Sequence, residues 1–447
     1  MQNKLVLLFS FCFIGMCFSQ EATNNFSLKE AVSFALKNNY NIKTAQNDVF
    51  SAREKKWETT TIGLPKINAT VDYQNWLKQQ ISLLPAEITG GPSGTFVPVA
   101  FGTKQNVNAT ITLNQLIFDG SYLVGLQSAK TYLNISELAK EKTELSIREA
   151  VINAYGNVLI AEKSIEILKS NIETLEKTLS DTKKIFKNGF TEEEDVEQLQ
   201  ITLTTVKNQL NKTVRLRDIG YKMLNISMGN LIDTPIVLTD NLTSLILENI
   251  DLSLMAKTLN VANHIDYKIA ENTKEGNRLL ILLEKSKALP SLNAFVNYGY
   301  AGNSNSFDFL NSNQKWYNSS LLGVSLNIPI FSSFERRSKT RQAKFEYENS
   351  DLKLIEAKEQ LNLQLASAKS DYKFSVEQYQ ATKQNLELAK RIERKQQIKF
   401  FEGVSSSFDL SQAQNQLYTQ QQNYIQSMLE VIAKKAALEN ALNIPIK

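Results

Sequence analysis

The sequence has little cysteine, histidine, proline and glycine for its 447 residues, and each shortage excludes a class of protein. With a single histidine, His264, histidine-based metal sites and catalytic triads are almost excluded. Both cysteines, Cys12 and Cys17, lie in the first 19 residues, so a chain without that segment has no disulfide, catalytic thiol or cysteine-bound metal. The net charge of +4 is too balanced for a nucleic-acid binder that relies on counterion release.

Long apolar runs are also missing. After residue 20 no window of about 18 consecutive apolar residues occurs, so the sequence predicts no transmembrane helix. Any part of the chain that spans a membrane would have to do so as strands closed into a barrel. Proline is absent from 99–234 and 330–444, which are rich in Lys, Glu, Leu, Gln and Ala and therefore predict long helices.

Residues 1–19 are predicted to be a secretory signal peptide. Lys4 supplies the positive charge, an apolar run follows it, and Cys17 and Ser19 are the small residues before a cleavage site after Ser19. A second interpretation makes Cys17 a lipid-anchored N-terminus, although Ile14-Gly15-Met16 matches the lipoprotein pattern poorly. Both interpretations predict that the protein is exported.

The chain contains two copies of one plan, which we place at 20–230 and 231–447. Short matches recur at offsets of 214 to 225, namely Ala45-Gln46-Asn47 with Ala270-Glu271-Asn272, Leu64-Pro65 with Leu289-Pro290, and Gly189 and Asp195 with Gly403 and Asp409. Each copy is predicted to run helix, strand, loop, strand, very long helix, sharp turn and helix. The loop 77–104 in the first copy carries an insertion that is rich in Gly and Pro.

Four segments alternate strictly between apolar and polar residues, which is typical of half-buried strands. They are 66–74, 106–114, 292–300 and 322–330, within the predicted β-barrel segments 66–118 and 291–331. Segments of about ten residues with one apolar and one uncharged polar face match the pattern of transmembrane barrels. An ordinary soluble sheet with one solvated face is the alternative.

The helical segments are predicted at 27–63, 120–229, 251–288 and 333–443. Apolar residues repeat there with coiled-coil spacing, at Leu168, Ile172, Leu175 and Leu179 and again at Val196, Leu199, Leu203, Val206 and Leu210. Such long helices need antiparallel neighbours. Residues 230–255 are predicted to form a short irregular belt against them.

Four strands are too few to close a barrel, because the smallest membrane barrels have about eight. An open sheet in lipid would leave edge N–H and C=O groups unpaired, at several kcal/mol each. Several copies must therefore share one barrel, and a dimer, a trimer or a tetramer would each satisfy this requirement. The helices would form a second tube outside the bilayer.

The sequence resembles the TolC family of outer-membrane efflux and secretion channels, from Ser27-Leu28-Lys29-Glu30-Ala31 to Leu442-Asn443-Ile444-Pro445. The resemblance implies a mainly α fold with a minor β part: a homotrimer with a shared twelve-stranded β-barrel in the outer membrane and a periplasmic α-barrel of coiled-coil helices. It implies an exit duct of a tripartite efflux or type I secretion system, which passes small molecules or polypeptides passively and is gated at its periplasmic tips. The implied partners are a periplasmic adaptor, an inner-membrane pump and outer-membrane lipid.

The helical hairpins turn at two glycines, and in the family these tips face the adaptor. The positions that match the docking motif are Gly189, Phe190 and Thr191 in the first copy and Gly403, Val404 and Ser405 in the second. A plain helix–helix turn with an incidental apolar residue is the alternative.

Asp195 and Asp409 each lie six residues after a tip glycine, where related channels have a carboxylate that projects into the closed periplasmic entrance. A ring of such carboxylates can hold cations. Helix capping is the alternative, because Thr191-x-x-Glu194 and Ser406-x-x-Asp409 both fit a capping box.

Trp76 and Trp316 lie near the ends of the predicted strand pairs, and we expect them in an aromatic girdle at the membrane interface rather than in a core. The sequence shows no catalytic constellation or phosphate-binding loop, so we expect neither an enzyme nor a cofactor, and energy must come from a partner. The alternatives are a soluble periplasmic coiled-coil scaffold or adhesin without a pore, and an enzyme with paired carboxylates in a barrel lumen.

Overall fold

The computed structural model describes residues 24–444, so the predicted signal segment, Cys17 and Pro445 lie outside the described residues. The described chain divides into two compact units, and each unit draws on both halves of the sequence. We call 24–43, 143–259 and 363–444 the helical unit, and 44–142 with 260–362 the strand unit. The boundary between the two sequence copies at 230 stays a prediction.

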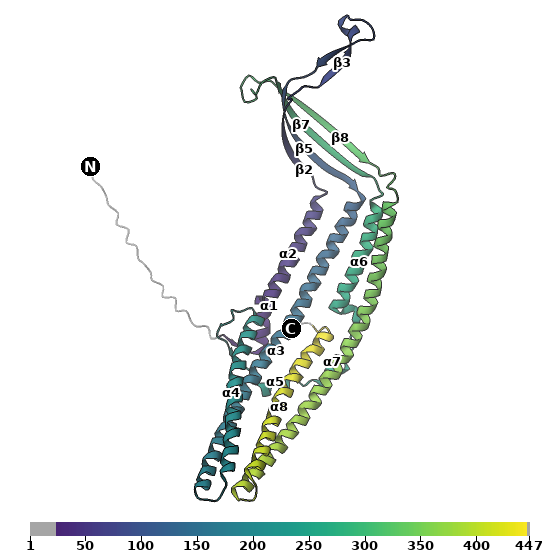
Figure 1. Cartoon of the computed structure of the whole chain (residues 1–447). Helices are drawn as coiled ribbons and strands as arrows, with labels where there is room; N and C mark the ends of the chain where they lie inside the picture. Colours follow the sequence, from purple (N-terminus) through teal and green to yellow (C-terminus); the bar gives the residue numbers. More distant parts are fainter. Residues whose placement is uncertain (1–23, 445–447) are drawn as a thin grey trace, which may run out of the picture. The chain divides into compact units, whose positions relative to one another are not determined.

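The strand unit contains an antiparallel sheet of four strands in the order β2-β5-β7-β8 (Figure 1). The strands are β2 (Lys66–Asn75), β5 (Gln105–Asp119), β7 (Ser291–Ser304) and β8 (Trp316–Asn327). The first three contain the predicted segments. The fourth is predicted at 322–330, but it begins earlier and ends at Asn327, which pairs with Ser291, the first residue of β7.

Apolar side chains on this sheet are exposed in the single chain. Ile67 and Val71 on β2, and Leu322 and Val324 on β8, each show more than half of their surface. Strands β2 and β8 also form the two edges of the sheet, so each has one side without a strand partner in the described chain. A bare apolar face with open edges indicates a surface that is covered by lipid or by another copy.

The insertion 77–104 forms a β-hairpin arm rather than a loop of turns. Its strands are β3 (Ile81–Pro85) and β4 (Phe96–Ala100), joined through the 3-10 helix η1 (Ala86–Thr89). Figure 1 shows the arm extending from the end of the sheet where β2 finishes.

The two longest helices are α3 (Gly120–Lys187) and α7 (Glu335–Phe401), and both agree with the predicted long helices. The strand unit also contains α6 (Ile265–Ser286) and most of α2 (Tyr40–Thr61). The helix predicted from 251 begins only at Ile265, after the 3-10 helices η2 (Leu252–Ala256) and η3 (Val261–Asn263). His264 caps it, because its Nδ1 accepts a hydrogen bond from the Asp266 N–H at 3.2 Å.

In the helical unit, two coiled-coil hairpins and a short belt share one core. The remaining elements are β1 (Asn25–Phe26), α1 (Leu28–Asn38), α4 (Glu193–Met228), β6 (Val237–Leu238), α5 (Leu242–Asn249) and α8 (Ser407–Ala441). The buried Tyr155 hydroxyl donates to the Phe26 carbonyl at 2.9 Å, and the buried Tyr372 hydroxyl donates to the Asn249 carbonyl at 2.8 Å. Tyr155 of α3 thus fixes β1 and Tyr372 of α7 fixes the belt, each through a satisfied buried hydroxyl.

The predicted coiled-coil seam is confirmed. Leu175 and Leu179 of α3 are buried with Leu199, Leu203 and Val206 of α4, and the cluster also takes in Phe400 and Leu410. None of the helices in residues 24–444 has the length and apolar character needed to cross a bilayer.

Candidate functional site

Both hairpin tips turn at a glycine in the left-handed region. Gly189 follows α3 with φ +75°, and Gly403 follows α7 with φ +72°. In each turn the next N–H reaches back into the helix: that of Phe190 donates to the Ile185 carbonyl at 3.1 Å and that of Val404 to the Lys399 carbonyl at 2.8 Å. This is the glycine-based helix end that left-handed φ makes possible, so the tip geometry follows from the sequence.

The apolar residue after each glycine is presented outward. Phe190 is 83% exposed and Val404 is 75% exposed, although both are residues that soluble proteins usually bury. Phe408, on the first turn of α8, is also exposed and was not singled out in the sequence. The tips therefore offer three apolar side chains to a partner and none of them to the core of the unit.

Asp195 ties the two tips together. One carboxylate oxygen accepts a hydrogen bond from the Thr191 hydroxyl, and the other accepts one from the backbone N–H of Ser407 at 3.1 Å, across to the start of α8. Partial burial raises the pKa of Asp195, but the hydrogen bonds from Ser407 and Thr191 outweigh it and hold the pKa below its ordinary value. The carboxylate is therefore ionised at neutral pH and serves as a bridge between the hairpins.

Asp409 has a local role in the single chain. Its carboxylate accepts hydrogen bonds from the Ser406 N–H at 3.3 Å, the Ser406 hydroxyl at 3.0 Å and the Ser405 hydroxyl at 3.2 Å. These hydrogen bonds, from the Ser406 hydroxyl first, lower the pKa of Asp409. The capping box predicted for Ser406 and Asp409 is confirmed, and the carboxylate remains exposed.

The other predicted capping box was wrong. The residue that caps α4 is Glu192, whose side chain makes no capping hydrogen bond, and Glu194 does not reach back to the cap. The reason is that the Thr191 hydroxyl turns to Asp195 instead. A side chain that the sequence pattern assigned to helix capping thus supports the bridge between the tips.

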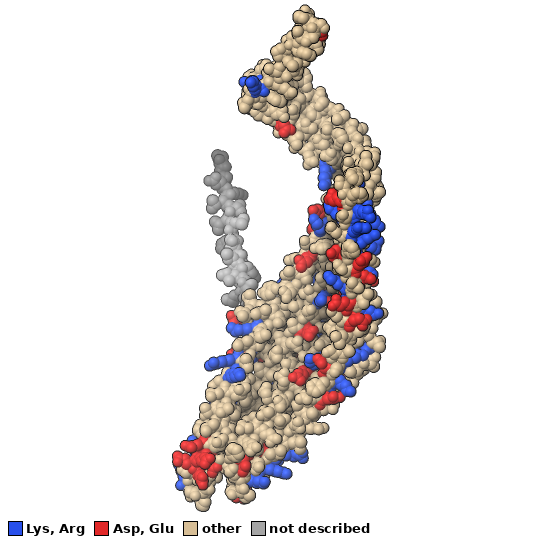
Figure 2. Space-filling model, turned by 45° about the vertical axis from the view of Figure 1, so that its right-hand side comes forward, with Lys and Arg blue, Asp and Glu red and all other residues tan. Residues whose placement is uncertain are grey.

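The first tip is strongly acidic, which the sequence analysis did not single out. Glu192, Glu193 and Glu194 are exposed and precede Asp195 without interruption. Figure 2 shows the acidic side chains gathered at the end of the α3–α4 hairpin. Acidic residues stabilise a helix N-terminus, but four in succession also make this tip attractive to cations.

Behind the tips, the hairpins meet through polar contacts. The Thr202 hydroxyl of α4 lies 3.0 Å from that of Ser411 of α8, and the Asn171 amide of α3 donates to the Gln421 side-chain oxygen of α8 at 2.8 Å. Gln414 lies buried at the same level, and its amide has no hydrogen-bond partner in residues 24–444. These polar contacts add to the apolar cluster, which also joins α8 to the first hairpin through the buried Leu410.

Trp76 and Trp316 lie at the same end of the sheet. The Trp76 N–H donates to the Lys104 carbonyl at 2.8 Å, and the Trp316 ring lies 6.4 Å from that of Phe309. Both indoles are partly exposed, at 42% and 40%. Their role in an interfacial girdle stays a prediction.

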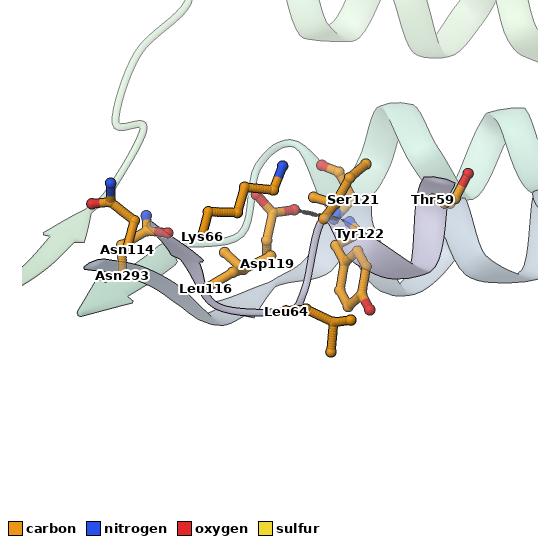
Figure 3. Close-up of a pocket in the computed structure, with 11 residues that line it drawn as sticks. Thr59, Leu64, Lys66, Asn114, Leu116, Asp119, Ser121, Tyr122 and Asn293 are labelled. Carbon is orange, nitrogen blue, oxygen red and sulfur yellow. Dashed lines mark hydrogen bonds between the residues drawn. The ribbon is translucent and has the colours of Figure 1, made fainter. Parts of the chain in front are cut away.

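The other end of the sheet has a pocket of about 500 Å³ where β5 passes into α3 (Figure 3). Asp119 lies in it, and its carboxylate accepts hydrogen bonds from the backbone N–H of Ser121 at 2.6 Å and of Tyr122 at 3.0 Å. The Tyr122 hydroxyl donates to the Thr60 carbonyl at 3.1 Å. These polar groups cap α3 and fasten it to α2, so we interpret the pocket as a structural junction.

Replacing Asp195 with asparagine is expected to loosen the bridge between the tips. The lost charge-assisted hydrogen bond contributes about 1 kcal/mol at a partly exposed site, so the Ser407 amide should exchange about five-fold faster. Because the pKa of Asp195 is lowered on folding, this stabilisation is present above the ordinary value of 3.8 and is lost as pH falls through the folded-state pKa. Hydrogen–deuterium exchange measures both effects. Glu194→Gln is the control, and equal exchange in both variants would contradict the bridge.

A family comparison accounts for these features together. Residues 31–230 and 278–443 match the family model described as outer membrane efflux protein. The chain belongs to the outer membrane efflux protein family. It is 23% identical over 348 residues to outer membrane protein TolC of Vibrio cholerae serotype O1, which covers 75% of this chain and 76% of the relative.

Two further comparisons agree. The chain is 22% identical over 329 residues to alkaline protease secretion protein AprF of Pseudomonas aeruginosa, covering 70% of this chain and 64% of the relative. The crystal structure of the outer membrane protein VceC from Vibrio cholerae superposes with a TM-score of 0.72 at 16% identity, covering 94% of this chain and 97% of VceC. The expected fold, mainly α with a minor β part, is confirmed.

The family also settles the broad function. The chain is an outer-membrane exit duct for efflux or secretion, as the sequence predicted. The family is one of channels rather than of enzymes. The tip residues, the acidic gate and the tryptophan girdle remain predictions.

Proposed function

We propose that three copies of this chain form the duct, with β2 of one copy paired to β8 of the next. The observation that carries this proposal is the four-stranded sheet, whose two edges and apolar face have no cover in the described chain. In lipid those edge groups must find partners, and another copy supplies strands of matching length. The long helices of the three copies would enclose the periplasmic half of the passage.

The assembly is testable by extraction and conductance. The protein should leave the membrane fraction only with detergent, migrate as a trimer, and produce discrete conductance steps in planar bilayers. Release by osmotic shock as a monomer without conductance would instead support a periplasmic coiled-coil scaffold.

The hairpin tips are the proposed docking surface for a periplasmic adaptor. Phe190, Val404 and Phe408 are exposed apolar residues on turns that glycine holds in place. Exposed apolar anchors on a fixed turn are the features that protein interfaces use most effectively. Since the duct belongs to a channel family, we propose no catalytic activity, and the adaptor would connect it to an inner-membrane pump that supplies the energy.

Asp195 and Asp409 are the proposed gate. Three copies would bring three carboxylates of each kind, together with the acidic run that begins at Glu192, near one periplasmic mouth. Such a ring concentrates cations and binds divalent ions across subunits. The bridge from Asp195 to Ser407 and the cap around Asp409 hold both carboxylates in fixed positions.

Asp195→Ala combined with Asp409→Ala is expected to weaken the block of single-channel current by Mg²⁺ about ten-fold or more, because both carboxylate rings are removed. The single variants should show intermediate effects. Asp218→Ala is the control, since Asp218 is an exposed acid on α4 far along the helix from the tip. An unchanged block in both single variants and in the double variant would end the proposal.

A further inference from the structure

The segment that follows β8 presents apolar side chains directly beyond the end of the sheet. Ile330, Phe331 and Phe334 are all more than 60% exposed, and the two phenylalanine rings lie 6.0 Å apart, edge to face. Ser333 and Phe334 have φ values of +47° and +66°, which non-glycine residues rarely adopt. The backbone is therefore held in a tight turn that keeps these aromatic rings on the surface.

Arg336 fixes this turn. Its guanidinium donates to the Ser332 hydroxyl at 3.1 Å, the Pro329 carbonyl at 3.0 Å and the Ile330 carbonyl at 3.4 Å. All of these partners belong to the segment between β8 and α7. Arg336 is thus a structural residue, and its side chain is only partly exposed.

A second set of basic residues does not stabilise the turn in this way. Arg337, Arg341 and Lys344 are spaced four and three residues apart at the start of α7, so they share one face of the helix. All three are exposed, and none forms an ion pair within the described part of the chain, whereas Lys339 is paired with Glu335 at 2.6 Å. Figure 2 shows basic side chains gathered over the start of α7, next to the end of the strands. We call Arg337, Arg341 and Lys344 the basic face.

We propose that the basic face binds the phosphate groups of anionic phospholipids at the periplasmic surface of the outer membrane, while Ile330, Phe331 and Phe334 insert among the lipid chains. The inference rests on the proposed placement of the sheet across that membrane. A basic segment beside a spanning element gains about 1 kcal/mol for each Lys or Arg near an anionic surface. Aromatic side chains favour the same interfacial depth, and arginine binds phosphate with two parallel hydrogen bonds.

Acidic residues of a neighbouring copy could also pair with the positive charge of the basic face. In the described strand unit the exposed Ile330, Phe331 and Phe334 lie on the sheet side of the basic face, which favours lipid, since a protein partner for the charge alone would not need them. The two partners can be distinguished. A neighbouring copy would stabilise the protein through the basic face in any lipid or detergent, whereas a phospholipid headgroup would do so only when it is anionic.

The test uses the full-length assembled protein in detergent, titrated with short-chain phosphatidylglycerol or with phosphatidylcholine. The readout is the midpoint of thermal unfolding, from which an apparent lipid affinity is obtained. Phosphatidylglycerol should stabilise the wild type, and the triple variant R337Q/R341Q/K344Q should bind it at least ten-fold more weakly. The effect should decline with added salt, and phosphatidylcholine should distinguish the variants little.

The matched control is K383Q/R391Q/R394Q, which removes the same charge from exposed positions elsewhere on α7. It should retain the wild-type response to phosphatidylglycerol. If phosphatidylglycerol stabilises the wild type and both triple variants equally, the proposal is overturned. It is also overturned if R337Q/R341Q/K344Q is less stable than the wild type by the same amount with and without lipid, since that result indicates a contact between copies. If the triple variant does not assemble, R341Q alone should still lose about three-fold in affinity.

Conductance in planar bilayers separates this inference from the proposed function. Both triple variants should form channels of wild-type conductance, because the basic face lies outside the proposed gate and tips. A wild-type protein that forms no channels would defeat the proposed trimeric duct, whereas channels with an unaltered lipid response in R337Q/R341Q/K344Q would defeat only the lipid site.

Discussion

Phe190→Asp combined with Val404→Asp is expected to abolish adaptor binding and to reduce export to the level of cells that lack the chain. The two side chains are the most exposed apolar groups of the tips, and each follows a glycine that fixes the turn. Anchors of this kind contribute about 2 kcal/mol or more to an interface, and an aspartate would in addition place a charge there. Together the substitutions should weaken binding by a factor of about 1,000, measured between the purified channel and the proposed periplasmic adaptor.

The tip variants need a control that changes an exposed apolar residue away from the tips. Leu216→Asp serves this purpose, because Leu216 is exposed on α4 and lies many turns from Phe190. It should bind the adaptor like the wild type. If the double tip variant assembles normally and binds with unchanged affinity, the tips are plain helix–helix turns and docking takes place elsewhere.

What the sequence predicted well is local. The leucine seam of the first hairpin, the glycine turns and the capping box of Ser406 and Asp409 each depend on residues within a few positions of one another. Period and capping patterns are sufficient for such features because the chain itself brings the partners together.

What the sequence predicted poorly depends on distant partners. The pattern at Thr191 fits a capping box as well as that at Ser406, yet Thr191 turns to Asp195, which accepts a backbone hydrogen bond from Ser407, 212 residues away. The strand predicted to Ile330 ends at Asn327 for a related reason. Its apolar alternation continues, but hydrogen bonding to β7 does not, and only the pairing register reveals the end.

Gly229→Ala is expected to disrupt the helical unit, because the end of α4 lies very close to the backbone of α1. Gly229 ends α4 with φ +86°, and a Cβ there would lie 2.3 Å from the Asn38 carbonyl oxygen and 2.7 Å from the Asn39 nitrogen. These are backbone atoms at the junction of α1 and α2, where the buried Asn39 amide also donates to the Ser227 carbonyl at 2.8 Å. They cannot rotate away as a side chain could, so α1 would have to move.

The expected loss is the sum of two physical costs. A left-handed alanine costs about 1–2 kcal/mol, and forcing packed helices apart costs about 1–3 kcal/mol more. For a unit of this size, that lowers the unfolding midpoint by about 4–20 °C, measured by helical circular dichroism in detergent. Accumulation in the outer membrane should fall as well.

Gly189→Ala isolates the first cost from the second. Gly189 has a similar φ of +75°, but no atom lies within 4 Å of its added Cβ. Gly189→Ala should therefore carry only the cost of a left-handed alanine. At an exposed tip that strain is relieved by local fraying rather than by global unfolding. A midpoint that falls by the same amount in both variants would show that backbone conformation alone requires glycine. A fall confined to Gly229→Ala would show that α4 must end there without a side chain so that the junction of α1 and α2 can pack against it.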